Sequence, residues 1–153
     1  MYQKIMVPLD GSKLAECVLP HLETVARGCA VPDIVLVRVV PPASPTVGDY
    51  ALDPAQVRRI DEENKTVAEE YLHNTAKQLA VGESRVSTQV LIGREAESLA
   101  DFATKNGFDL IIIATHGRSG VSRWVWGSVA DRVLRSACVP VLMVRAPGCI
   151  PGF

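Results

Sequence analysis

Five short apolar segments alternate with amphipathic stretches along the chain, and this alternation constrains the fold more than any other feature of the sequence. Runs of Val, Ile and Leu bounded by turn residues are typical of strands buried on both faces. Strands that are separated by helices pair in parallel through right-handed crossovers. The expected strands span residues 4–10, 33–40, 85–92, 109–115 and 139–145, and the expected helices span 12–27, 54–80, 94–106 and 128–137.

The pattern therefore predicts an α/β domain with a five-stranded, parallel, doubly wound sheet and helices on both faces, a Rossmann-like arrangement. Residues 41–53, with three prolines and a glycine, are expected to form a surface loop. We expect one domain over residues 1–146, followed by a C-terminal tail at 147–153.

Local signals set the expected helix ends and inner faces. Ser12 is a suitable N-cap for the first helix, but Pro20 lies inside that helix and predicts a kink. Asp53 and Pro54 start the second helix, and Gly107 ends the third. The side chains expected to face the core are Leu14, Val18, Leu22, Val25 and Ala26 in the first helix, Val57, Ile60, Val67, Ala68, Tyr71, Thr75 and Leu79 in the second, Ala96, Leu99, Ala100 and Ala103 in the third, and Val129, Val133, Leu134 and Ala137 in the fourth.

Composition narrows the class of protein. Charged residues make up 22% of the 153 residues and the formal net charge is −1, so nothing predicts a nucleic-acid partner. The apolar runs are too short for a membrane span, and the N-terminal sequence MYQKIMVPLD has no signal-peptide core. We therefore expect a cytoplasmic protein with no membrane partner. The four cysteines lack CxxC spacing, which favours free thiols over a metal site.

Ligands of doubly wound sheets bind beyond the carboxyl ends of the strands, where the winding direction reverses. Two strand ends carry polar groups: Pro8-Leu9-Asp10-Gly11-Ser12 after the first strand, and ATHGRSGVSRWVWGS (114–128) after the fourth. A strand order of 3-2-1-4-5 would place these two segments together. This order is the arrangement we predict.

The 114–128 segment has features of a phosphate site. Gly117 and Gly127 leave backbone amides open to an anion, and Ser128 begins a helix whose N-terminus favours negative charge. Arg118 and Arg123 can add positive charge. Asp10, after the first strand, is an acceptor suited to a ribose hydroxyl, so the two segments together suggest a nucleotide.

Simpler interpretations remain open for the same residues. The glycines can serve only a turn, since neither a P-loop nor a GxGxxG motif is present. Asp10 can serve only as a cap of the turn before Ser12. Trp124 and Trp126 fit packing better than base stacking, and His116 lacks a visible carboxylate partner for catalysis.

Three stretches resemble the universal stress protein (UspA-like) family: VPLDGS, VRVV, and ATHGRSGVSRWVWGSVADRVLRSACVPVLMVR, over essentially the whole chain. Nucleotide-binding members of that family carry Gly, two residues, Gly, nine residues, then Gly and Ser or Thr. Here Gly117, Gly127 and Ser128 match, whereas Ala114 stands at the first glycine position. The resemblance implies ATP or AMP as the ligand, which Mg²⁺ can accompany.

The resemblance also implies roles for individual residues. Those expected to line the site are Pro8, Asp10, Val39, Ile113, Ala114, Gly117, Arg118, Gly127, Ser128 and Val129. Asp10 would hold the ribose, the backbone of Val39 would meet the adenine edge, and Ile113 and Ala114 would form the floor. Gly117, Gly127, Ser128 and Val129 would surround the phosphates. Ala114 is compatible with this role if its φ is negative and strained if its φ is positive.

Function then divides into three alternatives. The leading one is a stress-response protein that binds an adenine nucleotide with little or no hydrolysis, because the 114–128 segment contains no carboxylate to act as a base or hold Mg²⁺. A second is a nucleotide-free interaction or scaffold module of the same fold. A third is a slow ATPase or a nucleotidyl-transferring enzyme that uses Asp10, Ser12 or His116.

The last strand predicts an oligomer. Pro140 near its start is typical of an edge strand, and an apolar edge left unpaired is an aggregation hazard. Pairing with the same strand of a second copy removes the edge, and the family resemblance implies the same homodimer through residues 139–145.

Overall fold

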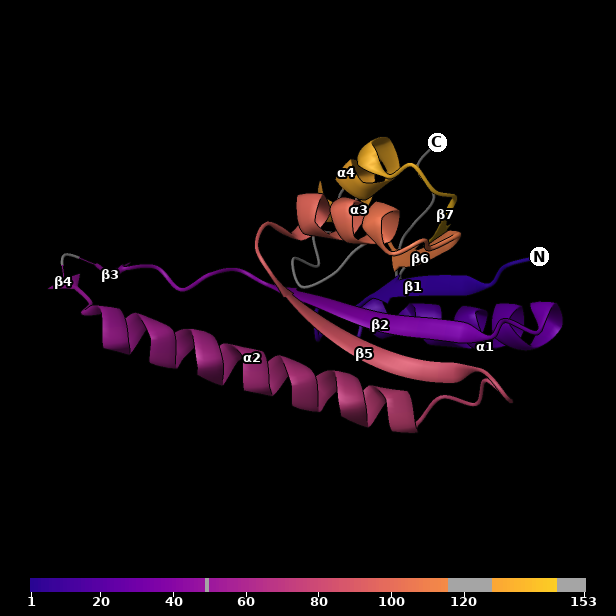
Figure 1. Cartoon of the computed structure of the whole chain (residues 1–153), viewed down its shortest axis with the longest axis horizontal. Coiled ribbons are helices and arrows are strands. Elements are labelled where there is room, and N and C mark those ends of the chain that lie inside the picture. Colours follow the sequence, from indigo (N-terminus) through magenta and orange to yellow (C-terminus); the bar gives the residue numbers. More distant parts are fainter. Residues whose placement is uncertain (49, 116–127, 146–153) are drawn as a thin grey trace.

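The computed structural model describes residues 1–48, 50–115 and 128–145. Its main element is a five-stranded parallel sheet in the order β5-β2-β1-β6-β7 (Figure 1). The strands are β1 (Lys4–Pro8), β2 (Asp33–Val40), β5 (Arg85–Ile92), β6 (Leu110–Ala114) and β7 (Val141–Val144). When these five strands are numbered along the chain, their order is 3-2-1-4-5, and the predicted α/β class is confirmed.

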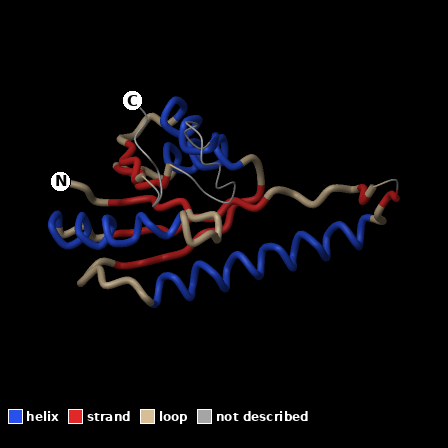
Figure 2. The backbone as a smooth tube through the Cα atoms, turned by 180° about the vertical axis from the view of Figure 1, so that it is seen from behind, coloured by secondary structure: helices blue, strands red, loops and turns tan. Residues whose placement is uncertain are grey.

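Helices cover both faces of this sheet. The 3₁₀ helix η1 (Ala15–Val18), α1 (Leu19–Cys29) and α2 (Pro54–Lys77) lie on one side, and α3 (Glu95–Lys105) and α4 (Ser128–Ser136) lie on the other (Figures 1 and 2). The winding direction reverses between β1 and β6, which pair through Ile5–Leu110 and Met6–Ile111.

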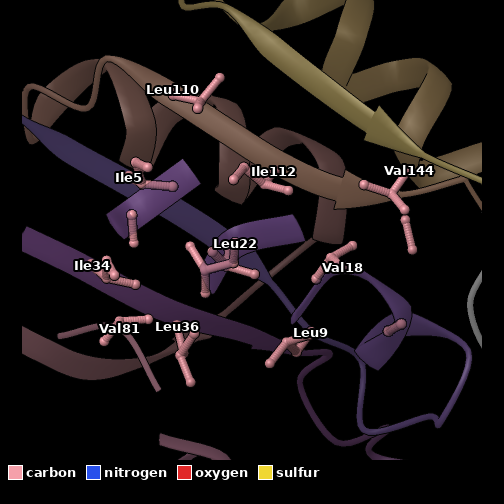
Figure 3. Packing of buried hydrophobic residues seen from close by; sticks show 14 of the residues in the cluster. Ile5, Leu9, Val18, Leu22, Ile34, Leu36, Val81, Leu110, Ile112 and Val144 are labelled. Carbon is pink, nitrogen blue, oxygen red and sulfur yellow. The ribbon is translucent and has the colours of Figure 1, made fainter. Parts of the chain in front are cut away.

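Two apolar clusters, one on each face, hold the layers together. Strand residues alternate between them: Ile5 and Val7 join the α1 side, whereas Met6 joins the α3 side. On the α1 side, Leu22 packs among side chains of β1, β2 and β6 (Figure 3). Burial of a side chain of this size stabilises the fold by roughly 1.5–3 kcal/mol.

The first helix differs from the prediction over 12–27. The α-helix begins at Leu19, after a 3₁₀ turn, so that Pro20 lies in the first helical turn and causes no kink. Proline fits there because the first turn has no intrahelical partner for its missing N–H. The predicted inner residues Val18, Leu22 and Ala26 are nevertheless buried.

The predicted loop at 41–53 contains a second, two-stranded sheet of β3 (Thr46–Val47) and β4 (Tyr50–Ala51). Gly48 supplies the positive φ of +59° that a tight hairpin requires. The hairpin lies next to the start of α2, well beyond the end of the main sheet (Figure 1). Asp53 caps α2 through a capping box with Gln56.

Two predicted core residues are exposed. Val67 of α2 has an exposed fraction of 59% and Leu134 of α4 has 44%. In α2 the buried residues are Ala68 and Thr75, which were predicted, and Leu72, which was not; in α4 they are Val133, which was predicted, and Ala130, which was not. Val67 lies next to Ala68 and Leu134 next to Val133, both of which are fully buried, so each exposed residue is turned by about 100° around its helix from the buried stripe. The first half of α2 extends past the main sheet (Figure 2). The inner residues predicted for α3 are all buried.

Candidate functional site

The carboxyl ends of β1 and β6 meet at the reversal point of the sheet. Because the two strands are parallel neighbours, the segments that follow Pro8 and Ala114 leave the same edge. Thr115 continues this edge, and its amide donates to the carbonyl of Val144 over 2.8 Å. The two polar segments singled out in the sequence are therefore adjacent where they begin.

Asp10 lies in a tight turn directly after β1. Its Oδ1 accepts a hydrogen bond from the amide of Ser12 over 2.8 Å, and the hydroxyl of Ser12 accepts from the amide of Ala15 over 3.1 Å. Gly11, between them, has a φ of +87°. Asp10 thus caps the turn, as one interpretation of the sequence held. A carboxylate can accept several hydrogen bonds at once, so the cap by itself does not exclude a contact with a ligand hydroxyl.

An apolar wall forms on the α3 side of this edge. Ile113, which is 5% exposed, belongs to the cluster against which Val39 and Val129 pack. Three residues expected around the nucleotide, from β2, β6 and α4, are therefore brought together in one cluster. Pro8, the last residue of β1, is also buried.

Ala114 occupies the position at which the family motif has glycine. It is the last residue of β6, pairs with Val144 of β7, and is 8% exposed. Among the described residues only Ala30 combines a side chain with a positive φ, so Ala114 carries no left-handed strain. Its methyl belongs to the α1-side cluster with Ala15 and Val18. The backbone and the packing at this position therefore suit alanine, and its effect on nucleotide binding stays a prediction.

Ser128 is the first residue of α4, as predicted, and is exposed. The other residues predicted at the phosphates, Gly117, Arg118 and Gly127, lie outside the described residues, as do His116, Arg123 and both tryptophans. Their roles remain predictions from the sequence.

A polar cluster behind Asp10 was not anticipated from the sequence. Arg38 of β2 places its guanidinium Cζ 5.3 Å from the ring centroid of Tyr71 on α2. The Tyr71 hydroxyl donates to Oε1 of Glu16 over 3.2 Å, and Glu16 also pairs with Lys13 over 2.8 Å. The signal that could have revealed this cluster is Arg38 itself, a charged residue inside the apolar run IVLVRVV.

Burial and charge act together on Tyr71. Removal of the ring from water raises the pKa of the Tyr71 hydroxyl well above its usual range, and the negative charges of Glu16 and Asp10 raise the same pKa further. Tyr71 is thus a neutral donor at physiological pH, and its ring lies within electrostatic reach of the carboxylate assigned to the ribose.

The described residues contain no group of three or more His, Cys, Asp and Glu side chains that could hold a metal ion. Burial raises the pKa of the Cys17 thiol. No helix in the described ranges is both long and apolar enough to cross a membrane.

A groove of about 480 Å³ lies between α2 and β5, away from the predicted site. It is lined by Lys65, Glu69, Glu70, His73, Thr88, Gln89 and Val90.

Comparison with known proteins decides the family. Residues 1–145 match the Universal stress protein family. The chain belongs to this family. Universal stress protein MJ0531 of Methanocaldococcus jannaschii is 33% identical over 150 residues, which cover 96% of this chain and 84% of that protein.

Solved structures of the universal stress protein family share the fold. UspA from Lactobacillus plantarum has a TM-score of 0.78 at 19% identity, over 94% of this chain and 98% of that one. A universal stress protein in complex with cAMP has a TM-score of 0.61 at 19% identity, over 95% and 98% of the two chains. An AMP-bound family member from Arabidopsis thaliana has a TM-score of 0.59 at 17% identity, over 94% and 92%.

Proposed function

We propose that this universal stress protein binds an adenine nucleotide, ATP or AMP, at the carboxyl edge between β1 and β6. The ligand acts as a regulator in a stress response, with little or no hydrolysis. Asp10 holds the ribose, Val39, Ile113 and Val129 form the apolar side of the adenine pocket, and the start of α4 meets the phosphates together with Gly117, Arg118 and Gly127.

The observation that carries this proposal is the adjacency of β1 and β6 in the sheet. It brings the carboxylate of Asp10 to the same edge as the segment that leads to the N-terminus of α4. A sugar and a phosphate chain need these two kinds of partner, a hydroxyl acceptor and a set of free amides, a few ångströms apart.

Two further points support a nucleotide. The methyl of Ala114 packs in the α1-side cluster, which supports a site that accepts alanine at the first glycine position. Members of the same fold have been solved with cAMP and with AMP, which share the adenine and ribose groups that the proposal places here.

The proposal includes little or no catalysis. Fast phosphoryl transfer needs a positioned water or base and usually Mg²⁺ held by carboxylates and hydroxyls. The segment from 114 to 128 contains no Asp or Glu, and Asp10 is assigned to the sugar. Mg²⁺ would then accompany ATP through the phosphates, and we assign it no protein ligand.

Titration calorimetry with ATP and AMP tests the proposal. Asp10→Asn can still accept from the Ser12 amide but lacks the negative charge, so it separates the turn from the ribose contact. It should weaken ATP binding by about tenfold, the loss of one hydrogen bond to a charged group. Gly127→Val should abolish binding, because the branched side chain blocks the approach of an anion to the backbone. Wild-type protein that binds neither nucleotide at millimolar concentration refutes the proposal.

We also propose that the protein is a cytoplasmic homodimer joined through β7.

An alternative function has the same fold but no nucleotide: the protein would be an interaction module. The exposed Val47 and Tyr50 of the β3–β4 hairpin, 60% and 81% exposed, are the observation that favours it. A partner complex that forms equally well with wild type and with Gly127→Val would support this second function.

A further inference from the structure

Arg38 is the only charged residue in the interior of β2, and its position is unusual for a strand buried on both faces. Its neighbours Val37 and Val39 belong to the cluster on the α3 side, whereas Leu36 belongs to the cluster on the α1 side. The alternation of the strand therefore directs Arg38 toward α1 and α2. The side chain is half-buried there, so its charge needs polar or oppositely charged partners.

The guanidinium of Arg38 is enclosed by an aromatic ring and a bare backbone. On one side its Cζ lies 5.3 Å from the Tyr71 ring centroid, within the range of a cation–π contact. On another side it lies against Gly11: a Cβ built on Gly11 would come within 3.0 Å of Cζ and Nη1 and 3.1 Å of Nη2. No other residue type would let Arg38 approach the turn after β1 so closely.

Two carboxylates lie around the same ring. Glu16 accepts the Tyr71 hydrogen bond, and the charges of Glu16 and Asp10 both act on the Tyr71 hydroxyl. The guanidinium is thus packed against the residue next to Asp10 and into a region of negative charge. An arginine has five donors in a rigid plane, which suits it to hold such a turn in one conformation.

We propose that Arg38 is a positioning residue of the nucleotide site, which fixes the Asp10–Gly11–Ser12 turn so that the carboxylate of Asp10 meets the ribose hydroxyls. This inference rests on the proposed function. Arg38 acts through Asp10 and does not itself touch the ligand. Its effect on binding is therefore confined to the ribose hydroxyls.

A nucleotide without those hydroxyls provides the readout. In wild type, ATP should bind about tenfold more tightly than 2′,3′-dideoxy-ATP, because only ATP offers hydroxyls to the charged acceptor Asp10. Arg38→Met keeps a long side chain against Tyr71 but loses the planar charged group. It should bind ATP about as weakly as wild type binds dideoxy-ATP, and its affinity for dideoxy-ATP should equal that of wild type.

Two further variants keep the test decisive. Arg38→Lys keeps the charge but loses the planar fork, and it should give an intermediate ATP preference; it replaces Arg38→Met if that variant fails to fold. Arg59→Met removes an exposed arginine of α2, 82% exposed and paired only with Glu63 in the described contacts, and should leave both affinities unchanged.

The possible outcomes distinguish a failure of the positioning role of Arg38 from a failure of the proposed nucleotide binding. Wild type that prefers ATP, with the same preference in Arg38→Met and Arg38→Lys, overturns the positioning role and leaves the nucleotide site standing. An equal loss of both ligands in folded Arg38→Met means a general structural role and also overturns the inference. Wild type that binds no adenine nucleotide overturns the proposed function and the inference with it.

Discussion

The hydroxyl of Tyr71 donates a hydrogen bond to Oε1 of Glu16 over 3.2 Å, although the two residues are 55 positions apart in the sequence. This bond joins α2 to the 3₁₀ turn η1, which directly follows the Asp10 turn. The long helix that extends beyond the sheet is thereby tied to the segment assigned to the ribose. A shift of α2 would therefore act on the segment next to the site through the Tyr71–Glu16 hydrogen bond.

The contribution of Tyr71 to the free energy of unfolding depends on pH. Its pKa is raised in the folded state above the value of about 10 expected for the unfolded chain. The contribution of Tyr71 is therefore fully present below about pH 10 and is lost as the pH rises further, because the unfolded chain ionises first. The free energy of unfolding of wild type should fall more steeply above pH 10 than that of Tyr71→Phe.

Urea unfolding of both proteins between pH 7 and pH 11 measures this difference. At pH 7 Tyr71→Phe should cost about 1 kcal/mol for the lost hydrogen bond. Absorbance titration provides an independent measurement: the variant should lack one tyrosinate step that wild type shows at high pH. Parallel slopes for the two proteins above pH 10 would contradict the raised pKa.

Two apolar residues of α2 should respond very differently to truncation. Leu72 is fully buried in the α1-side cluster, whereas Val67 is 59% exposed. Leu72→Ala should cost about 2–5 kcal/mol because it leaves a cavity in a packed cluster. Val67→Ala should change the free energy of unfolding by less than about 0.5 kcal/mol, in the range of surface substitutions.

Denaturation by urea with far-UV circular dichroism compares the two variants. A cost of more than about 2 kcal/mol for Val67→Ala would show that the exposed face of α2 around Val67 is covered in solution, for example by a second molecule.

The fate of Val67 shows what a periodic pattern can and cannot predict. The spacing of Val57, Ile60, Val67 and Tyr71 correctly indicates the apolar side of α2. It does not indicate how far the buried face reaches around the helix: Val67 is exposed although its neighbour Ala68 is fully buried, because the width of that face depends on packing with distant parts of the chain. The same reason applies to Leu134, which follows the fully buried Val133 of α4.

Short elements were missed for a different reason. The strands β3 and β4 have two residues each, which is too few for an alternation to be recognised. The start of the first helix was placed too early because the spacing of Leu14, Val18 and Leu22 continues across a 3₁₀ turn and an α-helix alike. Pro20 was the correct signal, but it marked the first turn of the helix where we expected a kink.

A candidate site residue could be predicted from the sequence where a polar side chain directly follows a strand. Asp10 was singled out because the carboxyl edge of a doubly wound sheet is where ligands bind, and the structure places it at that edge; its contact with a ribose stays a prediction. The strand order that makes this edge continuous follows from placing the two polar segments together, and the structure has that order. Arg38 was missed because it lies within a strand, and its contacts with Tyr71 and Gly11 depend on packing between distant parts of the chain.

Ala114→Gly restores the family glycine and tests whether the alanine impairs the site. Since the methyl packs with Ala15 and Val18 and the backbone is a strand, the change should destabilise the protein by about 1 kcal/mol. ATP affinity should stay within about twofold of wild type, which is under about 0.5 kcal/mol. Thermal unfolding and titration calorimetry measure the two effects. A tenfold gain in affinity would mean that the methyl obstructs the phosphates.

The edge position of β7 leads to a prediction about assembly. In the described sheet β7 pairs only with β6, and its Leu142 side chain is 38% exposed. An unpaired apolar edge favours pairing with a second copy of the same strand about a two-fold axis. We therefore expect a dimer at micromolar concentration, and we expect Leu142→Lys or Met143→Lys to give monomer or aggregate, because each buries an unpaired charge at the interface.

Light scattering coupled to size-exclusion chromatography measures the mass of each species. Val67→Lys is the matched control, since it introduces the same charge at an exposed position of α2. This helix packs over β2 and β5, at the opposite edge of the sheet from β7. That variant should remain a dimer. Because Met143 also packs into the α3-side cluster, Met143→Lys should lose stability as well as the partner, whereas Leu142→Lys should lose mainly the partner. A wild-type monomer at micromolar concentration would refute the pairing of β7.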